Sequence, residues 1–324
     1  METSQDAFAA ALEQHRGELQ LHCYRMLGSV QDAEDMVQET ALRAWRKRGD
    51  FEGRSTFRAW LYRIATNACL DALRRRRPRV LPPDVFAAAD PAQPLPAAAE
   101  GPWLEPYPDR LLDGIAAQDD EPEAVLVGKE TIELAFLAAI QHLPPRRRAV
   151  LILRDVVGWS ARDTAATLGI SVNSVNSSLQ RARSTLSARL PRRRIEWAQD
   201  APSGADRAVL RRYMAAHESG DAEGLARLLR DDVRASAPPL PLWYDGRDAL
   251  VASTRHRAVA GRFRFLATTA NRQQAAASYF RAPGESEYQP MGIDVLRIED
   301  GLVTEITAFL RPELFAVFGL PLTL

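Results

Sequence analysis

The sequence predicts a multidomain protein in which two all-α helical domains, joined by an acidic proline-rich linker, precede a C-terminal α+β domain. Three observations lead to this prediction. The 324 residues exceed the length of one ordinary domain. Apolar residues recur at helical spacing on both sides of a proline-rich stretch, and strand-like runs dominate the last third. The expected boundaries are 1–80, 81–123 for the linker, 124–195 and 204–324.

Seven helices are expected in the two helical domains, because apolar residues there recur every three or four positions. Three precede the linker, at Ala7–Met26, Val30–Arg46 and Thr56–Arg77, and Pro78 ends the last one. Four follow the linker, at Glu123–Leu143, Arg146–Val157, Ser160–Leu168 and Ser171 to about Arg189. Gly158 lies where a helix C-cap would be, and Ser160 and Ser171 lie where N-caps would be.

The C-terminal domain is expected to mix helices with strands. The predicted helices are Asp206–Ser219, Asp221–Leu229 and Asp248–Arg257. The predicted strands are Val233–Ala237, Arg262–Thr268, Gln274–Phe280, Met291–Ile298 and Leu302–Leu310. Asp300-Gly301, between the last two strands, is a strong hairpin signal.

The formal net charge of zero conceals alternating blocks of charge. Residues 1–80 carry +3 and residues 124–200 carry +6, whereas the linker carries −9 and residues 201–324 are neutral. A polyanionic partner is therefore expected for the helical domains only. The two cysteines, Cys23 and Cys69, match no metal spacing, and no apolar run is long enough to cross a membrane. We expect a cytoplasmic protein with no metal, no cofactor and no membrane partner.

The linker carries nine of the 21 prolines, which lack an N–H donor and have a fixed φ. A solvated tether is therefore the simplest interpretation. Trp103, Leu104 and Tyr107 are unusual in a solvated segment, however. They predict that the middle of the linker docks on a folded surface.

Residues 158–183 have the pattern of a helix-turn-helix, with a turn at Gly169 and small residues Ala165 and Ala166 where two helices would cross. Asn, Gln and Arg read base edges, and Ser and Arg bind phosphate. The side chains expected to face outward are Asn173, Ser174, Asn176, Ser177, Gln180, Arg181 and Arg183. Phosphate contacts are also expected from Arg146, Arg147 and Arg148. The alternative is an ordinary helical hairpin with a solvated polar face.

Two further segments suggest contacts with macromolecules. Residues 51–77 combine aromatic side chains with four closing arginines, a pattern that suits unpaired bases and their backbone. The alternative is that Phe57, Trp60 and Tyr62 fill a core, and for Trp60 we favour it. Residues 31–46 form a helix with an acidic face, which is unsuited to DNA and is either a partner-protein surface or a solvated face.

Three stretches occur in a distinctive order: DAEDMVQETALRAWR, FRAWLYRIATNACLDALRRRRP and LPPRRRAVLILRDVVGWSARDTAATLGISVNSVNSSLQRARSTL. Together they resemble a bacterial RNA polymerase sigma factor of the extracytoplasmic-function group of the sigma-70 family. The resemblance covers about residues 5–80 and 124–190. It implies a factor that binds core RNA polymerase and directs transcription from promoters by recognising −35 and −10 elements, with no catalysed reaction.

The resemblance also implies roles for individual positions. Contacts to core polymerase are expected at Asp32, Asp35, Gln38 and Glu39. Contacts to the −10 element are expected at Arg54, Ser55, Thr56, Phe57, Asn67, Asp71, Arg74 and Arg75. Contacts to the −35 element are expected at Arg146, Arg147, Ser171, Asn173, Ser174, Asn176, Ser177, Gln180, Arg181 and Arg183. Many relatives have a basic residue where Asn176 stands, so one phosphate contact is expected to be missing.

The C-terminal stretches PPLPLWYDGRDAL, ITAFL and FGLPLTL, with GPWLEPYPDR in the linker, resemble a subgroup that carries a SnoaL-like extension. The resemblance implies an α+β barrel that modulates sigma activity. A small-molecule ligand of this domain is an alternative, as is a repressor fused to a ligand-binding or catalytic module. The polar candidates for a pocket are Asp231, Asp232, Asp245, Asp248, Asp294, Tyr244, His217 and His256, and they match no catalytic pattern.

Overall fold

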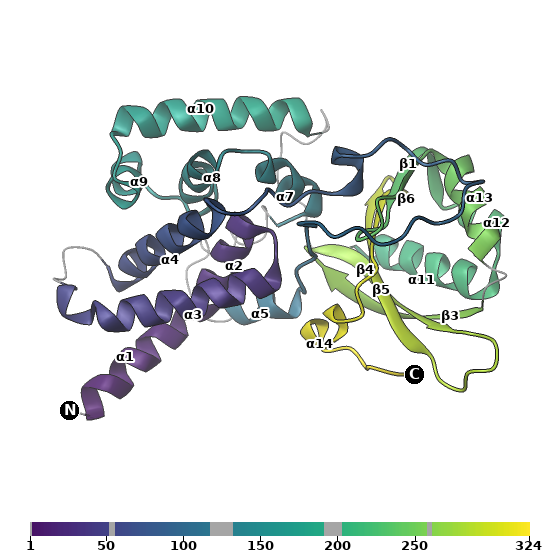
Figure 1. Cartoon of the computed structure of the whole chain (residues 1–324), viewed down its shortest axis with the longest axis horizontal. Coiled ribbons are helices and arrows are strands. Elements are labelled where there is room, and N and C mark those ends of the chain that lie inside the picture. Colours follow the sequence, from purple (N-terminus) through teal and green to yellow (C-terminus); the bar gives the residue numbers. More distant parts are fainter. Residues whose placement is uncertain (1, 52–55, 117–131, 191–202, 258–260) are drawn as a thin grey trace. The chain divides into compact units, whose positions relative to one another are not determined.

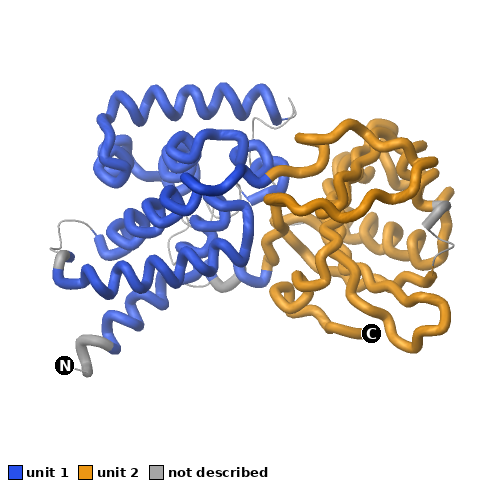
Figure 2. The backbone as a smooth tube through the Cα atoms, in the orientation of Figure 1, with its two compact units in different colours: residues 1–79, 110–198 blue, residues 80–109, 199–324 orange. Residues whose placement is uncertain are grey.

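The computed structural model describes residues 2–51, 56–116, 132–190, 203–257 and 261–324, which form two compact units (Figure 1, Figure 2). Unit 1 contains residues 1–79 and 110–198, and unit 2 contains residues 80–109 and 199–324. This grouping differs from the boundaries expected from sequence. Most of the predicted linker belongs to the C-terminal unit, and both predicted helical domains belong to one unit.

The first part of unit 1 is built from four helices. They are α1 (Glu2–Gln14), α2 (Arg16–Leu27), α3 (Val30–Arg46) and α4 (Phe57–Leu73), with a short 3₁₀ turn η1 (Arg48–Asp50). The bounds of α3 confirm the predicted helix Val30–Arg46. The hydroxyl oxygen of Ser29 accepts from the N–H of Asp32, which caps its first turn. The predicted helix Ala7–Met26 is instead two helices that break at His15, whose N–H bonds to Leu12 O.

In residues 110–116 and 132–190, which the structure describes, the second part of unit 1 contains five α-helices. They are α5 (Arg110–Ala116), α7 (Leu134–Gln141), α8 (Pro145–Leu151), α9 (Ala161–Leu168) and α10 (Val172–Arg189), with a π-helical turn η3 (Ile152–Val156) after α8. Pro145 occupies the first position of α8, where its missing N–H costs no hydrogen bond. Gly158 and Gly169 adopt φ of +76° and +64°, which let the chain reverse on either side of α9.

Arg148 is the largest fully buried side chain of the described residues and is 1% exposed. Its guanidinium donates to the backbone carbonyl of Met26, at the end of α2. It also donates to Gln141 O at 2.7 Å and to Leu143 O at 3.3 Å, both just beyond or at the end of α7. The amide of Gln141 accepts a further bond at 2.5 Å and donates to Arg25 O. Burial lowers the pKa of Arg148 to about 10, so the side chain stays charged at neutral pH.

Unit 2 is a six-stranded sheet covered by helices. The strands are β1 (Leu229–Ser236), β2 (Trp243–Asp245), β3 (Arg262–Ala270), β4 (Gln273–Arg281), β5 (Gln289–Glu299) and β6 (Leu302–Phe309), in the order β2-β1-β6-β5-β4-β3. The helices are α11 (Gly204–Ser219), α12 (Ala222–Ala226), α13 (Arg247–Arg257) and α14 (Leu314–Phe318). Helix α11 packs on β3 and β4, and α13 packs on β1.

The sheet is open, which corrects the predicted barrel. β1 and β6 pair in parallel, all other neighbours pair antiparallel, and β2 and β3 are the two edges among the described strands. The Asp300-Gly301 turn has φ of 52° and 77°, as its hairpin signal predicted. Sequence reasoning missed β2 and α14, because three-residue strands and five-residue helices are too short to show a period.

Residues 80–109, which we call the strap, run along unit 2 with a short 3₁₀ turn η2 (Pro82–Asp84). The strap ends against the β3–β4 turn, where the Tyr107 N–H donates to Asn271 Oδ1 at 2.8 Å. Asp109 accepts from the Arg272 N–H, and Glu105 forms an ion pair with Arg311 at 2.8 Å. Earlier in the strap, the Ala89 N–H donates to Trp243 O, and the Trp243 indole donates to Phe86 O.

The apolar residues singled out in the predicted linker are buried in unit 2. Trp103 is 5% exposed, and Leu104 and Tyr107 are fully buried. The Trp103 indole donates to Ala99 O at 2.9 Å, which satisfies its one polar atom. The strap is therefore an ordered part of unit 2, although its composition is typical of a solvated linker.

We predict that Arg148→Ala destabilises unit 1 by about 3 kcal/mol, because it leaves buried carbonyls of α2 and α7 without donors. Denaturant unfolding followed by circular dichroism measures this as a shift of the unfolding midpoint. Arg146→Ala, two residues away and exposed, is the matched control and is expected to change stability by less than about 0.5 kcal/mol. Equal effects of the two variants would contradict the role given to Arg148.

His22 gives unit 1 a pH-dependent stability. Burial lowers its pKa from 6.5 to about 3, and its ring lies 2.9 Å from the Thr66 hydroxyl. In the unfolded chain His22 binds a proton near pH 6.5, whereas in the folded chain it stays neutral until the pH approaches 3. The stability that neutral His22 contributes to the fold is therefore fully present above pH 6.5. It is lost as the pH falls toward 3, by up to about 1.4 kcal/mol per pH unit. We predict that His22→Gln flattens the unfolding free energy against pH in this window; an unchanged slope would refute it.

Candidate nucleic-acid and polymerase interfaces

Helices α9 and α10 form the helix-turn-helix that the sequence predicted. Ser160 and Ser171 cap the two helices through the N–H groups of Asp163 and Ser174. Val175, Leu179, Ala182 and Leu186 form the buried stripe of α10. The opposite face is polar, and every side chain predicted to face outward is exposed: Asn173, Ser174, Asn176, Ser177, Gln180, Arg181 and Arg183. This geometry suits a helix that enters a DNA major groove.

One basic side chain of this face is already engaged. Arg183 forms a two-pronged ion pair with Asp155, with N–O distances of 2.8 and 2.6 Å. The hydrogen bond to Asp155 raises the pKa of Arg183 above its usual value. A phosphate would have to compete with this carboxylate for the guanidinium. Arg181, in contrast, donates to Ser177, one turn earlier in its own helix.

The three arginines at the start of α8 differ in position. Arg146 is exposed and Arg147 is half-buried, so both remain candidates for phosphate contacts. Arg148 is buried beneath them and donates to backbone carbonyls, which corrects the expectation that it contacts phosphate. The sequence alone could not show which of the three arginines is buried, because a run of identical residues does not indicate which one faces the core.

Helix α4 presents an exposed polar stripe. Asn67, Asp71 and Arg74 lie one turn apart on it, and Arg75 is exposed beside them. Asp71 pairs with Arg43 at 3.2 Å and with Arg74 at 3.1 Å. Arg63 extends the stripe by one turn toward the start of α4, at the spacing i−4 from Asn67, and sequence reasoning missed it.

The residues before α4 are only partly described. Arg54 and Ser55 lie outside the described residues. Thr56 caps α4 by accepting from the Ala59 N–H at 3.2 Å. Phe57 is half-buried in an aromatic cluster, with ring centroids 5.6 Å from Phe8 and 5.7 Å from Phe51.

Two aromatic candidates for base stacking belong to the core. Trp60 is 4% exposed and Tyr62 is 3% exposed. The Tyr62 hydroxyl donates to Glu18 at 3.0 Å, and burial raises the pKa of this phenol. The core interpretation favoured for Trp60 is therefore confirmed.

The candidate side chains of the acidic helix α3 differ in how far they are buried. Asp32 pairs with Arg76 at 2.7 Å and with Arg79 at 2.5 Å. Burial alone would raise the pKa of Asp32, but the bonds from Arg79 and Arg76 outweigh it and lower the pKa. Asp35 and Gln38 are exposed, and Glu39 pairs with Arg43 at 2.6 Å. Leu42 is 52% exposed and lies one turn from Gln38.

A cleft within unit 1 separates α4 from α9. It is lined by Thr56, Ala59, Trp60 and Arg63 of the α4 side and by Trp159, Asp163, Ala166 and Thr167 of the α9 side. At its inner end the rings of Tyr62 and Trp159 lie 5.5 Å apart. The start of the α4 stripe therefore faces the first helix of the helix-turn-helix.

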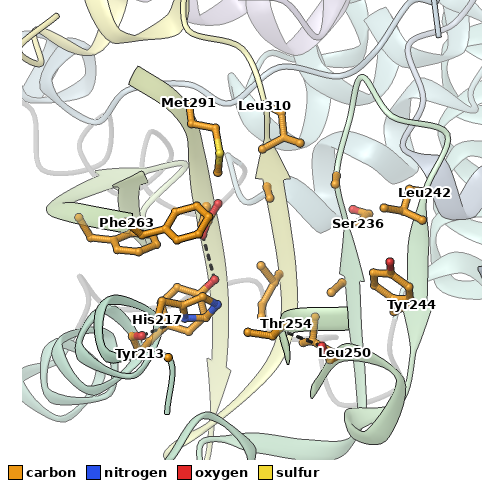
Figure 3. Close-up of a pocket in the computed structure, with 17 residues that line it drawn as sticks. Tyr213, His217, Ser236, Leu242, Tyr244, Leu250, Thr254, Phe263, Met291 and Leu310 are labelled. Atoms are coloured by element: carbon orange, nitrogen blue, oxygen red, sulfur yellow. Dashed lines mark hydrogen bonds between the residues drawn. The ribbon is translucent and has the colours of Figure 1, made fainter. Parts of the chain in front are cut away.

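Unit 2 contains a cavity of about 80 Å³ on the sheet face that α11 and α13 cover (Figure 3). Of the five candidate aspartates, only Asp294 lines it. The other four, Asp231, Asp232, Asp245 and Asp248, are exposed. Tyr244 and His217 also line the cavity, and the His256 side chain is outside the described set. No group of acidic, histidine and cysteine side chains in the described ranges could hold a metal ion.

Comparisons with known proteins agree with this arrangement. Residues 11–79 match Sigma-70 region 2, residues 133–186 match Sigma-70, region 4, and residues 210–306 match the SnoaL-like domain. The chain is 43% identical over 320 residues to "ECF RNA polymerase sigma factor SigG" of Mycobacterium tuberculosis, covering 97% of this chain and 84% of the relative. It is 32% identical to "ECF RNA polymerase sigma factor SigW" of Bacillus subtilis over 186 residues, 57% of this chain and 90% of the relative.

One solved structure resembles the whole chain. The crystal structure of the Mycobacterium tuberculosis extracytoplasmic function sigma factor SigJ covers 96% of this chain and 98% of its own, at a TM-score of 0.57 and 24% identity. This likeness shows a shared fold. The shared fold includes the C-terminal unit as well as the helical unit.

Fold and sequence together define a sigma-70 type transcription initiation factor, which is not an enzyme. The chain belongs to the ECF RNA polymerase sigma factor family and carries a C-terminal SnoaL-like domain. Factors of this family bind core RNA polymerase and direct transcription from promoters. In the described part of the chain, no helix is both long and apolar enough to cross a membrane.

The Arg183–Asp155 pair generates a prediction about DNA affinity. We predict that Asp155→Asn frees Arg183 for a phosphate, tightens promoter binding several-fold and steepens the slope of log affinity against log salt by about 1. Fluorescence anisotropy with the polymerase holoenzyme at several salt concentrations measures both quantities. Asp163→Asn, an exposed acid on α9, is the control. A salt slope unchanged by Asp155→Asn would mean that Arg183 does not contact DNA.

Proposed function

We propose that the two halves of unit 1 divide the promoter between them. The outer face of α10, from Ser171 to Arg183, reads the −35 element, with Arg146 and Arg147 on the backbone. The α4 stripe and the loop before it, including Arg54 to Phe57, bind the −10 element. The supporting observation is the α10 face, where all seven predicted side chains are exposed around a buried stripe.

We propose that the exposed face of α3 contacts core polymerase through Asp35, Gln38, Glu39 and the apolar side chain of Leu42. Asp32 acts differently from the other three predicted residues. Its pairs with Arg76 and Arg79 fix the chain that follows α4. Asp32 therefore supports this surface from beneath, with its side chain only 15% exposed.

Run-off transcription with core polymerase and fragmented genomic DNA tests the proposed function directly. Promoter-specific transcripts are the expected result. Asn173→Ala, on the reading face, is expected to lower transcript yield about tenfold by removing one base contact. Ser187→Ala, exposed in the last turns of α10, is the matched control. Absence of transcripts from every fragment would overturn the proposal, and equal yields from the two variants would remove α10 as the reader.

The packing within unit 1 bears on regulation. Elements named −35 and −10 are about 25 base pairs apart, which is roughly 85 Å along B-DNA at 3.4 Å per base pair. Helix α4 packs against both α8 and α9, and Tyr62 and Trp159 are in ring contact. A single chain in this closed arrangement cannot reach both elements. We infer that unit 1 opens before the promoter is read.

We propose that unit 2 modulates this opening through the strap. The strap covalently joins the segment after α4 to α5, and fully extended it would reach on the order of 100 Å. Docked on unit 2, it is held at both ends of its length, by Trp243 near one end and by Asn271 and Arg311 near the other. In the closed arrangement α5 packs on α2, so the strap becomes part of the tether between the two halves only when α5 leaves α2. Docking on unit 2 then keeps this tether short and restrains the separation of the halves.

This restraint generates a prediction. Glu105→Gln removes the ion pair with Arg311 and weakens strap docking by about 1 kcal/mol, so we expect up to about fivefold more run-off transcript. Glu299→Gln makes the same chemical change at an ion pair with Arg230 and Arg297 that does not involve the strap. The control is expected to leave transcript yield unchanged. A fall in transcript with Glu105→Gln would mean that the docked strap assists initiation.

A further inference from the structure

The cavity of unit 2 has Tyr213, His217 and Asp294 in walls that are mostly apolar and also include Ser236, Tyr244 and Thr254. Leu242, Leu250, Phe263, Met291, Ile306 and Leu310 supply much of the apolar lining. Tyr213 and His217 of α11 lie together on one side, opposite Leu242 and Tyr244 (Figure 3). The Tyr213 hydroxyl donates to Asp294 Oδ2 at 2.9 Å, and the rings of Tyr213 and His217 lie 4.3 Å apart. Concave apolar sites with a few convergent polar groups are typical of small-molecule pockets.

The charge of the lining limits the chemistry of an occupant. Asp294 is the one aspartate or glutamate among the described lining residues, which include no lysine or arginine. An anionic head group would bring a second negative charge next to Asp294, and the described lining offers no lysine or arginine to offset it. A carboxylate can accept several hydrogen bonds, so a donor group on the occupant is favoured beside the bond that Tyr213 makes.

The size of the cavity limits the occupant further. Its volume of about 80 Å³ is roughly half that of an engineered cavity that takes up benzene. The enclosed part of an occupant is therefore a short chain with its head group. Burial of that chain supplies the favourable free energy, and the head group fixes its orientation.

We propose that this cavity binds a small, largely apolar molecule that carries a hydroxyl or amino group and no negative charge. Asp294 accepts a hydrogen bond from the head group, Tyr213 orients the carboxylate, and the apolar walls enclose the chain. Binding to unit 2 does not depend on the proposed modulating role. Its effect on the strap deepens that role and rests on it.

The β1–β2 hairpin lies between the cavity and the strap. Leu242 and Tyr244 line the cavity, and Trp243 between them holds the strap through Phe86 and Ala89. Strand β2 pairs with β1 along Ser236, Ala235 and Arg234, so the two functions share one short two-stranded element. An occupant that orders this hairpin also orders the strap contacts on its other side.

Methyl NMR of the full chain tests binding directly. The chain has five methionines, and Met291 lines the cavity whereas Met26 is buried in unit 1. Three probes share a four-carbon chain and differ in the head group: 1-butanol, butylamine and butyrate. We expect saturable shifts of the Met291 methyl with the alcohol or the amine, no shift with butyrate, and no shift of Met26. Met291→Leu assigns the resonance, and the two positive probes distinguish a hydroxyl ligand from an amine.

Two variants test whether the shifts of the Met291 methyl depend on the carboxylate of Asp294. Asp294→Asn is expected to weaken binding of the effective probe at least tenfold. Asp232→Asn, the same change at an exposed ion pair with Arg230, is expected to leave binding unchanged.

Hydrogen exchange then reports on the strap. The Ala89 amide, which donates to Trp243 O, is expected to exchange more slowly with the effective probe and not with butyrate.

The outcomes separate this inference from the proposed function. No shift of Met291 with either donor probe, or equal binding of butyrate, would overturn the ligand site whatever the transcription assays give. Binding with unchanged exchange at Ala89 would overturn the link to the strap. Failure of run-off transcription would overturn the sigma function and leave the NMR result standing. The wild-type selectivity among the three probes needs no variant, so misfolding of Asp294→Asn cannot obscure it.

Discussion

The buried guanidinium of Arg148 is the constraint on which unit 1 depends. A charge removed from water is costly unless it is hydrogen-bonded, and here the two terminal nitrogens of Arg148 donate to the carbonyls of Met26, Gln141 and Leu143 and to the Gln141 side chain, while Nε has no partner among the described residues. These carbonyls belong to both halves of unit 1. Arg148 therefore bonds across the two halves of unit 1, which we propose bind the −10 and −35 elements. In the proposed opening, water replaces the Met26 carbonyl as an acceptor for the guanidinium, so these bonds stabilise the closed state and can be broken reversibly.

The same physics explains what sequence could predict. Helix Val30–Arg46 and the helix-turn-helix followed from local signals, namely caps, glycine turns and a 3.6-residue period. Arg148 was expected to contact phosphate and is buried instead, because burial depends on what packs against each face of a helix, which no local pattern records. The strap is the clearest case: its prolines and acids describe an unstructured tether, whereas its three buried apolar side chains and its bonds to Asn271 and Arg311 depend on residues more than 150 positions away.

Several charged residues on the proposed interfaces already have partners of opposite charge. Arg183 pairs with Asp155, and Asp71 pairs with Arg43 and Arg74. Exposed pairs of this kind contribute little to stability, so a phosphate can displace the carboxylate at small cost. Their main effect is to lower the affinity of the free factor for DNA in general. Specific binding then requires several contacts at once, which the polymerase complex provides by positioning both halves of unit 1.

Regulation by unit 2 requires a difference in free energy between closed and open states, since an interaction equal in both shifts nothing. In the proposed mechanism the strap supplies this difference, because once α5 has left α2 the strap is part of the tether between the two halves and its docking keeps the tether short. The β1–β2 hairpin would connect a ligand with the strap, because Leu242 and Tyr244 line the cavity and Trp243 bonds to the strap. A small change in hairpin order, worth no more than one hydrogen bond, would change the fraction of open factor several-fold. A weakly binding molecule of a few carbon atoms can therefore be an adequate signal, provided that it binds only when the hairpin is ordered.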